Sequence, residues 1–558
     1  MSSFRNPLEG LDVYRDLEEQ LRKRGGPVLV GGLADAAKGQ FAEAVLRAER
    51  PLKLFVTYDE LRARELYEDL LSFGADALLY PAKDLLFFAA DVRSNELSAV
   101  RIDVRRRIAE GGSGFVVTTI DALMDKLEAP ERFLRRCLRI NASDRLDLSE
   151  TAKQLAELGY ERSAEVDGRG QFSVRGGILD VFPVTEEAPV RIELWDDEID
   201  SMRRFDPESQ RSTEGLESVH IYPAREELLG GSDSFLRYFS GDKALLILDE
   251  PERLLERARE VEREYLASAE GRGEGETTKE AIVTASLLWE DLQSSATLCL
   301  AGLDSRIPDF TIRAEFSIAA KAVASFPGNF ELLIEDLRRY RRERWSVILM
   351  TPSRTRARRL AEAFQSYELS AFCPDETGEQ LPEAQAGSIM LLSGKLHRGF
   401  EYPLLRFALL AESDLFGRRK EKKKRRKHSE QAGSHISALS ELSVGDYVVH
   451  EENGLGIYRG VEKIETDGVA RDYIKIEYKD GDNFYVPATR LDAIQKYASA
   501  EAAVPRLNRL GSPEWGKTKT RVKRAVREIA KELVTLYATR LKEKGHRYGP
   551  DTVWQTEF

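Results

Sequence analysis

The chain has 558 residues, 42% of them hydrophobic and 32% charged, with a formal net charge of −12. This length predicts several globular domains of roughly 100–200 residues each. The negative charge argues against a protein that coats DNA over its whole surface, so any nucleic-acid contact should be local. Three widely spaced cysteines, no signal-peptide core and no apolar run near the ~20 residues of a membrane helix predict a cytoplasmic protein without disulfides, bound metal or membrane contact.

The first quarter of the chain has an α/β pattern. Residues 1–135 alternate apolar, strand-like runs with charged helical stretches, as in KLFVTYD followed by ELRARELYEDLLSFG. This alternation predicts a parallel sheet covered by helices. The pattern returns at 226–335. Residues 136–225 instead have short runs of β-branched and aromatic residues separated by Gly and Pro turns, so we expect them to be a β-rich insert in one α/β domain.

The segment VLVGGLADAAKGQFAEAVL, residues 28–46, has the order of a phosphate-binding loop: strand, Gly-rich turn, helix. Gly32 and Lys38 occupy the places of the first glycine and the lysine of that motif. Ala37 replaces its second glycine, and Gly39 replaces the hydroxyl residue that binds magnesium. We therefore expect a degenerate P-loop-type domain whose nucleotide site is inactive.

The run LLILDEP places Asp249 and Glu250 at the end of an apolar strand. In active ATPases such acids hold a metal-bound water and polarise the attacking water. A strand end followed by a helix that starts at Pro251 explains the same residues. Without a hydroxyl at position 39 the two acids lack a complete metal site, so they are expected to be inactive too.

Four further segments follow in chain order. They are a small α/β domain at 336–417, a basic linker at 418–437, a compact β domain at 438–505 and a long helix at 512–545. The basic run 418–427 is either a solvated linker or a phosphate-contacting segment.

The insert carries the most specific motifs, FSVRGGILDVFP and VRIELWDDEIDSMRRFDPESQRS. They place Trp195 on short strands together with Arg175, Arg191, Arg203 and Arg204. Arginine and tryptophan are enriched at binding hot spots. From the physics alone, ordinary charged strand faces explain the pattern equally well.

These two motifs resemble the bacterial transcription-repair coupling factor family and, more distantly, the UvrB damage-recognition subunit. The resemblance extends through LLILDEP, GFEYPLLRFALLAESDLFG, GDYVVHEENGLGIYRGVEKIE and WGKTKTRVKRAVREIAKELVTLYA, and it covers nearly the whole chain. It implies an N-terminal portion of the family: a UvrB-like module with a UvrA-binding insert, a small third domain, a CarD-like RNA polymerase-interacting domain of Tudor-like β-barrel fold, and a connecting helix. The motor would begin at 546–558 and lie largely beyond this chain.

The resemblance also implies a function, namely coupling transcription to nucleotide excision repair. The family binds stalled RNA polymerase through its β subunit and recruits UvrA. Its ATP- and magnesium-dependent motor acts on double-stranded DNA and releases the polymerase. The UvrA-contact positions fall on Arg175, Arg191 and Trp195, where the aromatic residue is Trp instead of the expected Phe, and the polymerase contact falls on Ile464. For this chain alone we expect no cofactor and no catalytic residue.

Two details bear on these implied contacts. The stretch AADV, residues 89–92, is too short to hold the damage-probing hairpin of UvrB. Ile464 lies near a predicted strand end, just before Asp467 and Gly468, where an open edge could accept a strand from a partner. A place in the domain core explains the same isoleucine.

Two other functions remain open. One is an ATP-dependent, UvrB-like helicase or nuclease subunit that uses Lys38 and Asp249, against which Gly39 argues. The other is a CarD-like transcription regulator with an unrelated N-terminal extension, which would have no use for a UvrA-binding face.

Overall fold

The computed structural model describes most of the chain up to residue 516 and scattered positions beyond it. The described residues are 6–23, 26–47, 49–83, 95–207, 209–226, 231–241, 244–271, 282–295, 297–302, 310–324, 330–374, 386–416, 442, 444–450, 452–466, 469–487, 494–497, 505–510, 512, 514–516 and single or paired positions from 518 to 536. The segment 89–92, the basic linker at 418–437 and residues 546–558 lie outside them.

Apolar strand-like runs form one large mixed sheet. Its strands are β1 (Val28–Leu33), β2 (Leu52–Thr57), β3 (Ala77–Tyr80), β4 (Gly114–Thr119), β13 (Ala244–Asp249), β14 (Thr297–Leu300), β15 (Ala314–Ala322), β16 (Ser346–Thr351), β17 (Ala371–Phe372), β18 (Ile389–Ser393), β19 (Phe400–Tyr402) and β20 (Phe407–Ala411). Their order is β17-β18-β16-β20-β19-β15-β1-β14-β13-β2-β4-β3. Pairing is parallel except at β15–β19 and β19–β20. The α/β prediction is confirmed.

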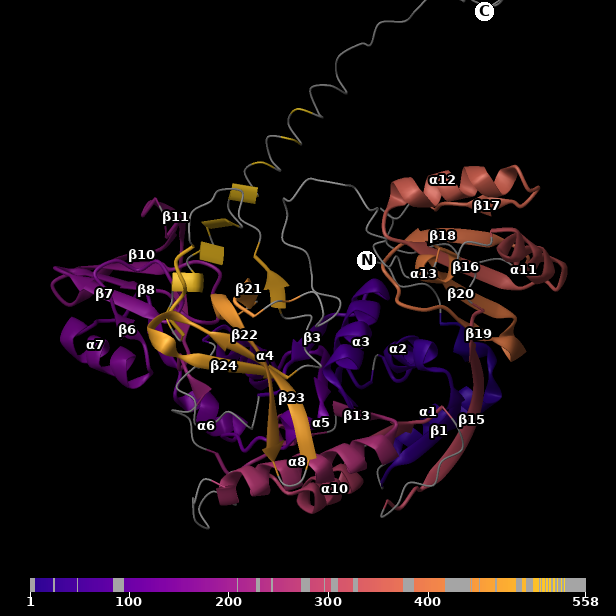
Figure 1. Cartoon of the computed structure of the whole chain (residues 1–558), viewed down its shortest axis with the longest axis horizontal. Coiled ribbons are helices and arrows are strands. Elements are labelled where there is room, and N and C mark those ends of the chain that lie inside the picture. The colour runs from indigo at the N-terminus through magenta and orange to yellow at the C-terminus, as the bar shows by residue number, and fades with distance from the viewer. Residues whose placement is uncertain are drawn as a thin grey trace, which may run out of the picture.

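Helices cover both faces of this sheet (Figure 1). They are α1 (Asp12–Arg22), α2 (Asp35–Ala44), α3 (Glu60–Ser72), α4 (Asn95–Ala109), α5 (Ile120–Leu123), α6 (Pro130–Arg135), α8 (Pro251–Gly271), α10 (Ala285–Ser294), α11 (Phe330–Arg342), α12 (Arg354–Gln365) and α13 (Glu412–Phe416), with short 3-10 turns at η1 (Pro7–Gly10), η4 (Phe235–Phe239) and η5 (Pro403–Leu405). Among the described residues, no helix has the length and apolar character needed to cross a membrane. The three cysteines are free thiols.

Strand β15 joins two units that the sequence predicts as separate domains. It pairs in parallel with β1 and, further along, antiparallel with β19. Beside this junction, Tyr402 Oη on β19 donates to Gln40 Oε1 on α2 at 2.8 Å. The small α/β unit at 336–417 therefore continues the sheet of the first domain, and backbone hydrogen bonds fix the two units relative to each other.

The insert emerges from one side of the large sheet (Figure 1). Its strands form a six-stranded sheet in the order β11-β10-β9-β8-β7-β6 and a two-stranded β12–β5 ribbon. The bounds are β5 (Leu138–Asn141), α7 (Leu148–Glu157), β6 (Glu161–Arg162), β7 (Gln171–Arg175), β8 (Ile178–Val181), β9 (Val190–Trp195), β10 (Glu198–Phe205), β11 (Ser212–Gly215) and β12 (Ser218–Ile221).

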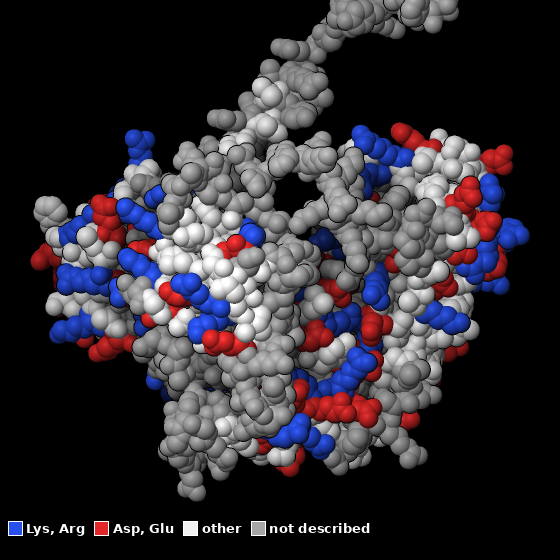
Figure 2. Space-filling view, viewed as in Figure 1, with Lys and Arg blue, Asp and Glu red and all other residues white. Residues whose placement is uncertain are grey.

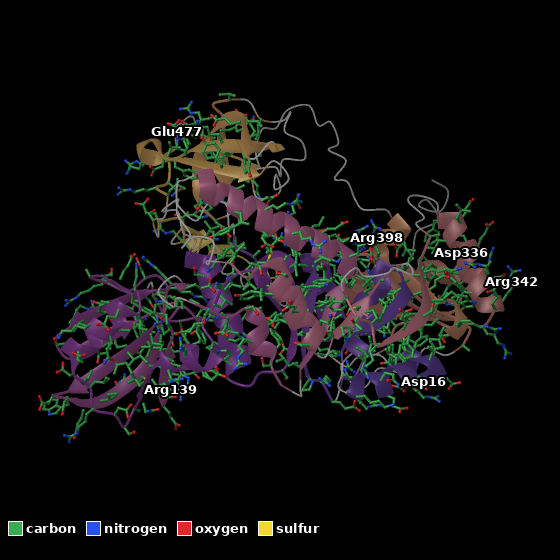
Figure 3. All side chains as sticks on the ribbon, turned by 90° about the horizontal axis from the view of Figure 1, so that it is seen from below. Asp16, Arg139, Asp336, Arg342, Arg398 and Glu477 are labelled. Atoms are coloured by element: carbon green, nitrogen blue, oxygen red, sulfur yellow. The ribbon has the colours of Figure 1, made fainter. Side chains whose placement is uncertain are left out.

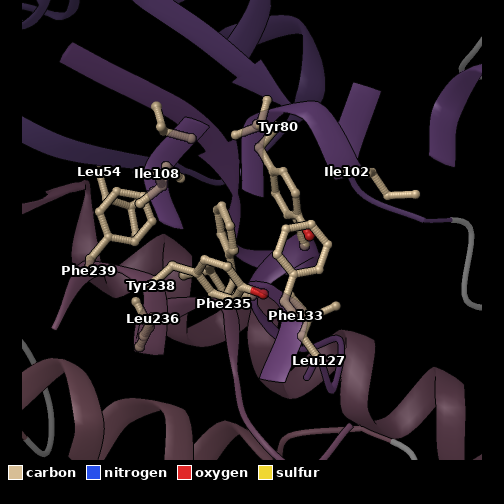
Figure 4. Packing of buried hydrophobic residues seen from close by; sticks show 14 of the residues in the cluster. Leu54, Tyr80, Ile102, Ile108, Leu127, Phe133, Phe235, Leu236, Tyr238 and Phe239 are labelled. Atoms are coloured by element: carbon tan, nitrogen blue, oxygen red, sulfur yellow. The ribbon is translucent and has the colours of Figure 1, made fainter. Parts of the chain in front are cut away.

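An aromatic cluster lies in the core shared by the first sheet and the insert. The rings of Tyr80 and Phe235 stack with centroids 3.8 Å apart, and Phe133 stacks on Tyr222 with centroids 5.2 Å apart. Figure 4 shows Tyr80, Phe133, Phe235 and Tyr238 in this packing. The cluster ties the last residues of the insert to the first α/β domain.

The C-terminal β domain is a five-stranded sheet in the order β24-β23-β22-β21-β25. Its elements are β21 (Tyr447–His450), β22 (Gly454–Thr466), β23 (Val469–Glu477), η7 (Lys479–Gly481), β24 (Asn483–Pro487) and β25 (Ile494–Lys496). Among the described residues β24 and β25 end the sheet without pairing with each other, so the expected closed barrel is not confirmed. Figure 3 shows this sheet, marked by Glu477, beside α8. Helical residues occur at scattered positions from 514 to 536.

Candidate functional site

The region predicted as a phosphate loop contains no loop. Strand β1 ends at Leu33 and helix α2 begins at Asp35, so Ala34 alone separates them. The predicted Gly-rich turn is therefore wrong: residues 35–37 form the first turn of α2, and Lys38 follows within the helix. Gly32 has a φ of +84°, and a Cβ there would lie 3.0 Å from the carbonyl oxygen of Ile318. This backbone is closed against β15 and does not curve around an anion.

Lys38 is fully buried and its ammonium group lies among three carboxylates. Its Nζ atom is 2.7 Å from Asp249 Oδ1, 2.5 Å from Glu250 Oε1 and 2.9 Å from Asp35 Oδ1. Burial lowers the pKa of Lys38, but the three carboxylates outweigh it and hold that pKa well above the usual lysine value. An ammonium group has three donors. All three are used here, so none remains for a phosphate.

The same cluster is closed from the other side. Asp249 Oδ2 accepts hydrogen bonds from Thr57 Oγ1 at 3.2 Å and Arg62 Nε at 3.3 Å, and Glu250 Oε1 accepts one from the Gly302 amide at 2.8 Å. Glu250 has a φ of +51°, in the left-handed region, which is costly for a non-glycine residue.

The acidic oxygens of Asp35, Asp249 and Glu250 lie within 4.8 Å of one another, a grouping that could hold a metal ion. Here the Lys38 ammonium supplies the positive charge. A cation would have to displace it. Position 39 cannot supply a ligand for such a cation. A Cβ on Gly39 would point at α3 and its C-terminal end, 3.6 Å from Phe73 and 3.7 Å from Leu66.

In the insert, two of the predicted binding residues converge on a buried acid. Asp180, on β8, lies between β7 and β9 in register with Ser173 and Arg191. Its carboxylate accepts Arg191 Nε at 2.7 Å, Arg191 Nη2 at 2.9 Å and Arg175 Nη2 at 2.8 Å. Hydrogen bonding to Asp180, which outweighs partial burial, raises the pKa of Arg191. The structure thus brings Arg175 and Arg191 together.

Trp195 lies at the same end of this sheet. Arg175 ends β7 before the Gly176–Gly177 turn, and Trp195 ends β9 before the next hairpin; the Leu194 amide donates to the Gly177 carbonyl at 2.8 Å, which joins the two ends. The Trp195 side chain is 82% exposed. A tryptophan this exposed at the end of an inner strand of a folded sheet is a candidate contact residue.

Two further arginines of the insert are bound to neighbouring acids. Arg203 contacts Glu193 at 3.3 Å, and Arg204 contacts Glu186 at 3.0 Å and Glu214 at 3.1 Å. Figure 2 shows positive and negative side chains interspersed over the visible described surface, with no large field of one sign.

Ile464 lies in the distal half of strand β22. Strand β21 pairs with β22 only from Gly454 to Ile457, whereas Ile464 pairs with Arg471 of β23. Within the described part of the domain, the other edge of β22 from residue 459 to 466 has no strand partner. The side chain of Ile464 lies outside what the structure describes, so its exposure stays a prediction.

Sequence reasoning missed Asp180 and Gln210. Arg191 Nη1 donates to the Gln210 carbonyl at 3.2 Å and Arg191 Nη2 to Gln210 Oε1 at 3.1 Å. A signal was present for Asp180: a single acid between Leu179 and Val181 in a buried strand requires a cationic partner. No comparable signal marks Gln210.

Comparisons with known proteins add the family context. Residues 138–226 match the model of the UvrB interaction domain, and residues 442–498 match that of the CarD-like/TRCF RID domain. The whole chain is 30% identical to the transcription-repair-coupling factor of Bacillus subtilis, covering 51% of it. It is also 28% identical to that of Staphylococcus aureus (strain bovine RF122 / ET3-1) and 27% identical to that of Staphylococcus haemolyticus, in each case over 95% of this chain and 50% of the relative. The chain thus spans about half the length of these curated relatives.

Proposed function

Because this chain corresponds over its whole length to the N-terminal portion of the transcription-repair-coupling factors, we propose that it couples transcription to nucleotide excision repair as an adaptor. The C-terminal β domain docks on the β subunit of stalled RNA polymerase, and the insert recruits UvrA. The relatives are about twice as long as this chain. The proposal therefore assigns ATP hydrolysis with magnesium, movement on double-stranded DNA and polymerase release to the part of these relatives that this chain does not cover. It places the function in the cytoplasm.

The observation that carries this proposal is the surface formed by Arg175, Arg191 and Trp195 within the segment that matches the UvrB interaction domain. A transcription regulator of the CarD type would not need this surface. The open edge of β22, in the segment that matches the CarD-like/TRCF RID domain, supports the polymerase contact by strand addition.

The test measures both partners on the same protein. The 558-residue chain is immobilised and exposed separately to UvrA and to RNA polymerase. We expect Arg175→Ala/Arg191→Ala/Trp195→Ala to lose UvrA and to keep polymerase. Ile464→Arg should lose polymerase, keep UvrA and leave the melting temperature nearly unchanged. Each variant is the control for the other.

Three outcomes contradict parts of the proposal. Wild-type UvrA capture by the triple variant would remove these residues from the interface. A stable Ile464→Arg variant that still binds polymerase would remove Ile464. An Ile464→Arg variant that unfolds the domain would place Ile464 in the core, since a buried unpaired charge costs several kcal/mol.

We further propose that this chain binds no nucleotide. The support is the Lys38 ammonium group with its three carboxylate contacts. Isothermal titration with Mg-ATP should give no binding heat. Micromolar affinity that Lys38→Ala abolishes would instead favour the ATP-dependent, UvrB-like enzyme.

A further inference from the structure

One buried carboxylate organises the proposed UvrA surface. Asp180 is fully buried and binds both Arg175 and Arg191. It accepts two parallel hydrogen bonds from Arg191, the bidentate geometry that fixes the plane of a guanidinium group. With Arg191 fixed in this way, the second lone pair of Oδ2 is directed at Arg175.

The two arginines differ in what they offer a partner. A guanidinium group has five N–H donors. Arg191 uses four of them on Asp180 and Gln210, its side chain is 16% exposed, and it lies 4.6 Å above the Phe205 ring. The side chain of Arg175 makes one hydrogen bond to described residues and is 45% exposed. Arg175 therefore presents the free donors, and Arg191 belongs mainly to the support beneath them.

Gln210 completes this support from a different part of the chain. It has a φ of +57°, and its Nε2 atom donates to the carbonyls of Val166 at 3.3 Å and Pro207 at 2.9 Å. Its own carbonyl and Oε1 both accept from Arg191. The segments GGILDVFP and FDPESQRS, distant in sequence, thus hold one guanidinium group between them.

We infer that Asp180 is a positioning residue of the docking surface: supported by Arg191 and Gln210, it orients the guanidinium of Arg175 toward UvrA. This inference rests on the proposed function, because it names the residue that prepares the same surface for its partner. Orientation before binding saves part of the entropy that a long, exposed arginine otherwise loses on association.

The first experiment is a double-mutant cycle in the 558-residue chain. Affinity for UvrA encoded in the same genome is measured for wild type, Arg175→Ala, Asp180→Asn and the double variant. We expect Asp180→Asn alone to weaken binding about tenfold, the value of one charge-assisted hydrogen bond. In the Arg175→Ala background the same change should have almost no effect. Asp200→Asn, an exposed acid of the same sheet, is the matched control.

A purely structural role gives a different result, because it weakens binding equally in both backgrounds; that outcome overturns the inference. Gln210→Ala serves as the second variant if Asp180→Asn does not fold. It removes the Oε1 acceptor of Arg191 Nη2, keeps the backbone carbonyl that accepts from Nη1, and leaves the Asp180 charge unaltered. Its smaller loss of affinity should likewise disappear in the Arg175→Ala background.

The second experiment needs no UvrA. Phenylglyoxal modifies guanidinium groups, and peptide mass mapping reports the rate at Arg175. We expect Asp180→Asn to accelerate modification of Arg175 several-fold and Asp200→Asn to leave it unchanged. If the rate rises but wild-type protein does not bind UvrA, the proposed function is wrong and the orientation of Arg175 by Asp180 stands. If neither rate nor affinity changes, the inference is wrong.

Discussion

Two clusters of charged side chains are built alike but differ in exposure. The Lys38 cluster consists of Lys38, Arg62, Asp35, Asp249 and Glu250. The Arg175 cluster consists of Arg175, Arg191 and Asp180. In each, a fully buried aspartate at the centre binds two cationic side chains. Around Asp249 both cations are enclosed: the side chain of Lys38 is 0% exposed and that of Arg62 is 11% exposed. Around Asp180 one cation, Arg175, reaches the surface.

The difference separates a structural device from a docking surface. A buried cation whose donors are all used can only hold elements together, here α2 with β13, through an aspartate that also contacts β2 and α3. Arg175 shares Asp180 with the more buried Arg191, so its guanidinium group is oriented and still has N–H donors for a partner. A buried ion pair alone therefore does not indicate a binding site. An exposed cation in the pair is the feature that points to binding of a partner.

Removing the buried cation should have the largest effect. Lys38→Met leaves three carboxylates near one another without the ammonium group that neutralises them, and breaking such a buried pair costs about 3–5 kcal/mol. Urea denaturation of the first α/β domain measures the loss. Lys153→Met, on an exposed lysine of α7 that contacts Glu150 at 3.5 Å, should change stability little. Equal stability of the two variants would contradict the closed-cluster assignment.

Changing the exposed aromatic residue should affect binding and leave folding intact. Trp195→Ala changes a residue that is 82% exposed, so its folded-state contacts are few. At an interface hot spot the change costs about 2 kcal/mol or more of binding free energy. UvrA affinity and the melting temperature are measured together, with Trp195→Phe as the conservative comparison. A lower melting temperature with unchanged affinity would assign Trp195 to the fold.

Removing the exposed cation, Arg175, should affect stability much less than removing Lys38. Arg175→Ala leaves Asp180 paired with Arg191, so the unfolding free energy should fall by about 1 kcal/mol or less. Lys38→Met leaves Arg62 on Asp249, but Asp35 and Glu250 lose the ammonium group that contacts both. A loss of stability for Arg175→Ala as large as that for Lys38→Met would show that both clusters are structural.

Much of the fold could be predicted from sequence, because apolar runs such as those of β1, β13 and β16 form strands that are buried at all or all but one of their positions. The continuation of the sheet through β15 could not. Its residues alternate between exposed and buried positions, and nothing local specifies that one end pairs with β1 and the other with β19. Partner choice between distant strands depends on tertiary packing that no local pattern records.

The Gly-rich turn predicted from the phosphate-loop motif is wrong for a local reason. A glycine-rich stretch stays open around an anion, whereas Ala34, Ala36 and Ala37 favour helix. Asp35, in the first helical turn, adds a favourable interaction with the helix dipole. The helix therefore starts three residues before Lys38, and the lysine points into the protein. In the insert, the residue types singled out Arg175, Arg191 and Trp195, and their role in binding stays a prediction. The sharing of Asp180 by two arginines depends on strand register, which the sequence does not specify.

A third ion pair, intermediate in exposure, should give the smallest effect and a pH dependence. His397, in the loop after β18, is half-buried; its Nδ1 atom is 2.9 Å from Asp69 Oδ1 on α3, and Glu68 lies 3.4 Å from Nε2. The hydrogen bond that the protonated ring donates to Asp69 outweighs burial and raises the pKa of His397 above its usual value. The folded state therefore binds a proton more tightly than the unfolded state. Its stabilisation is complete below the unfolded histidine pKa of about 6.5 and is lost as pH rises through the folded value.

We expect the free energy of unfolding to fall by at most about 1 kcal/mol as the pH rises from about 6 through the folded pKa, as for other partly exposed pairs. The contact joins the 336–417 unit to α3, so hydrogen exchange in α3 should rise over the same range. His397→Gln keeps a hydrogen-bonding side chain without the titration and should flatten the profile, while His220→Gln, at an exposed pair with Glu110, should leave it unchanged. A profile that His397→Gln does not alter would show that His397 is not the group whose titration weakens the contact between the two units.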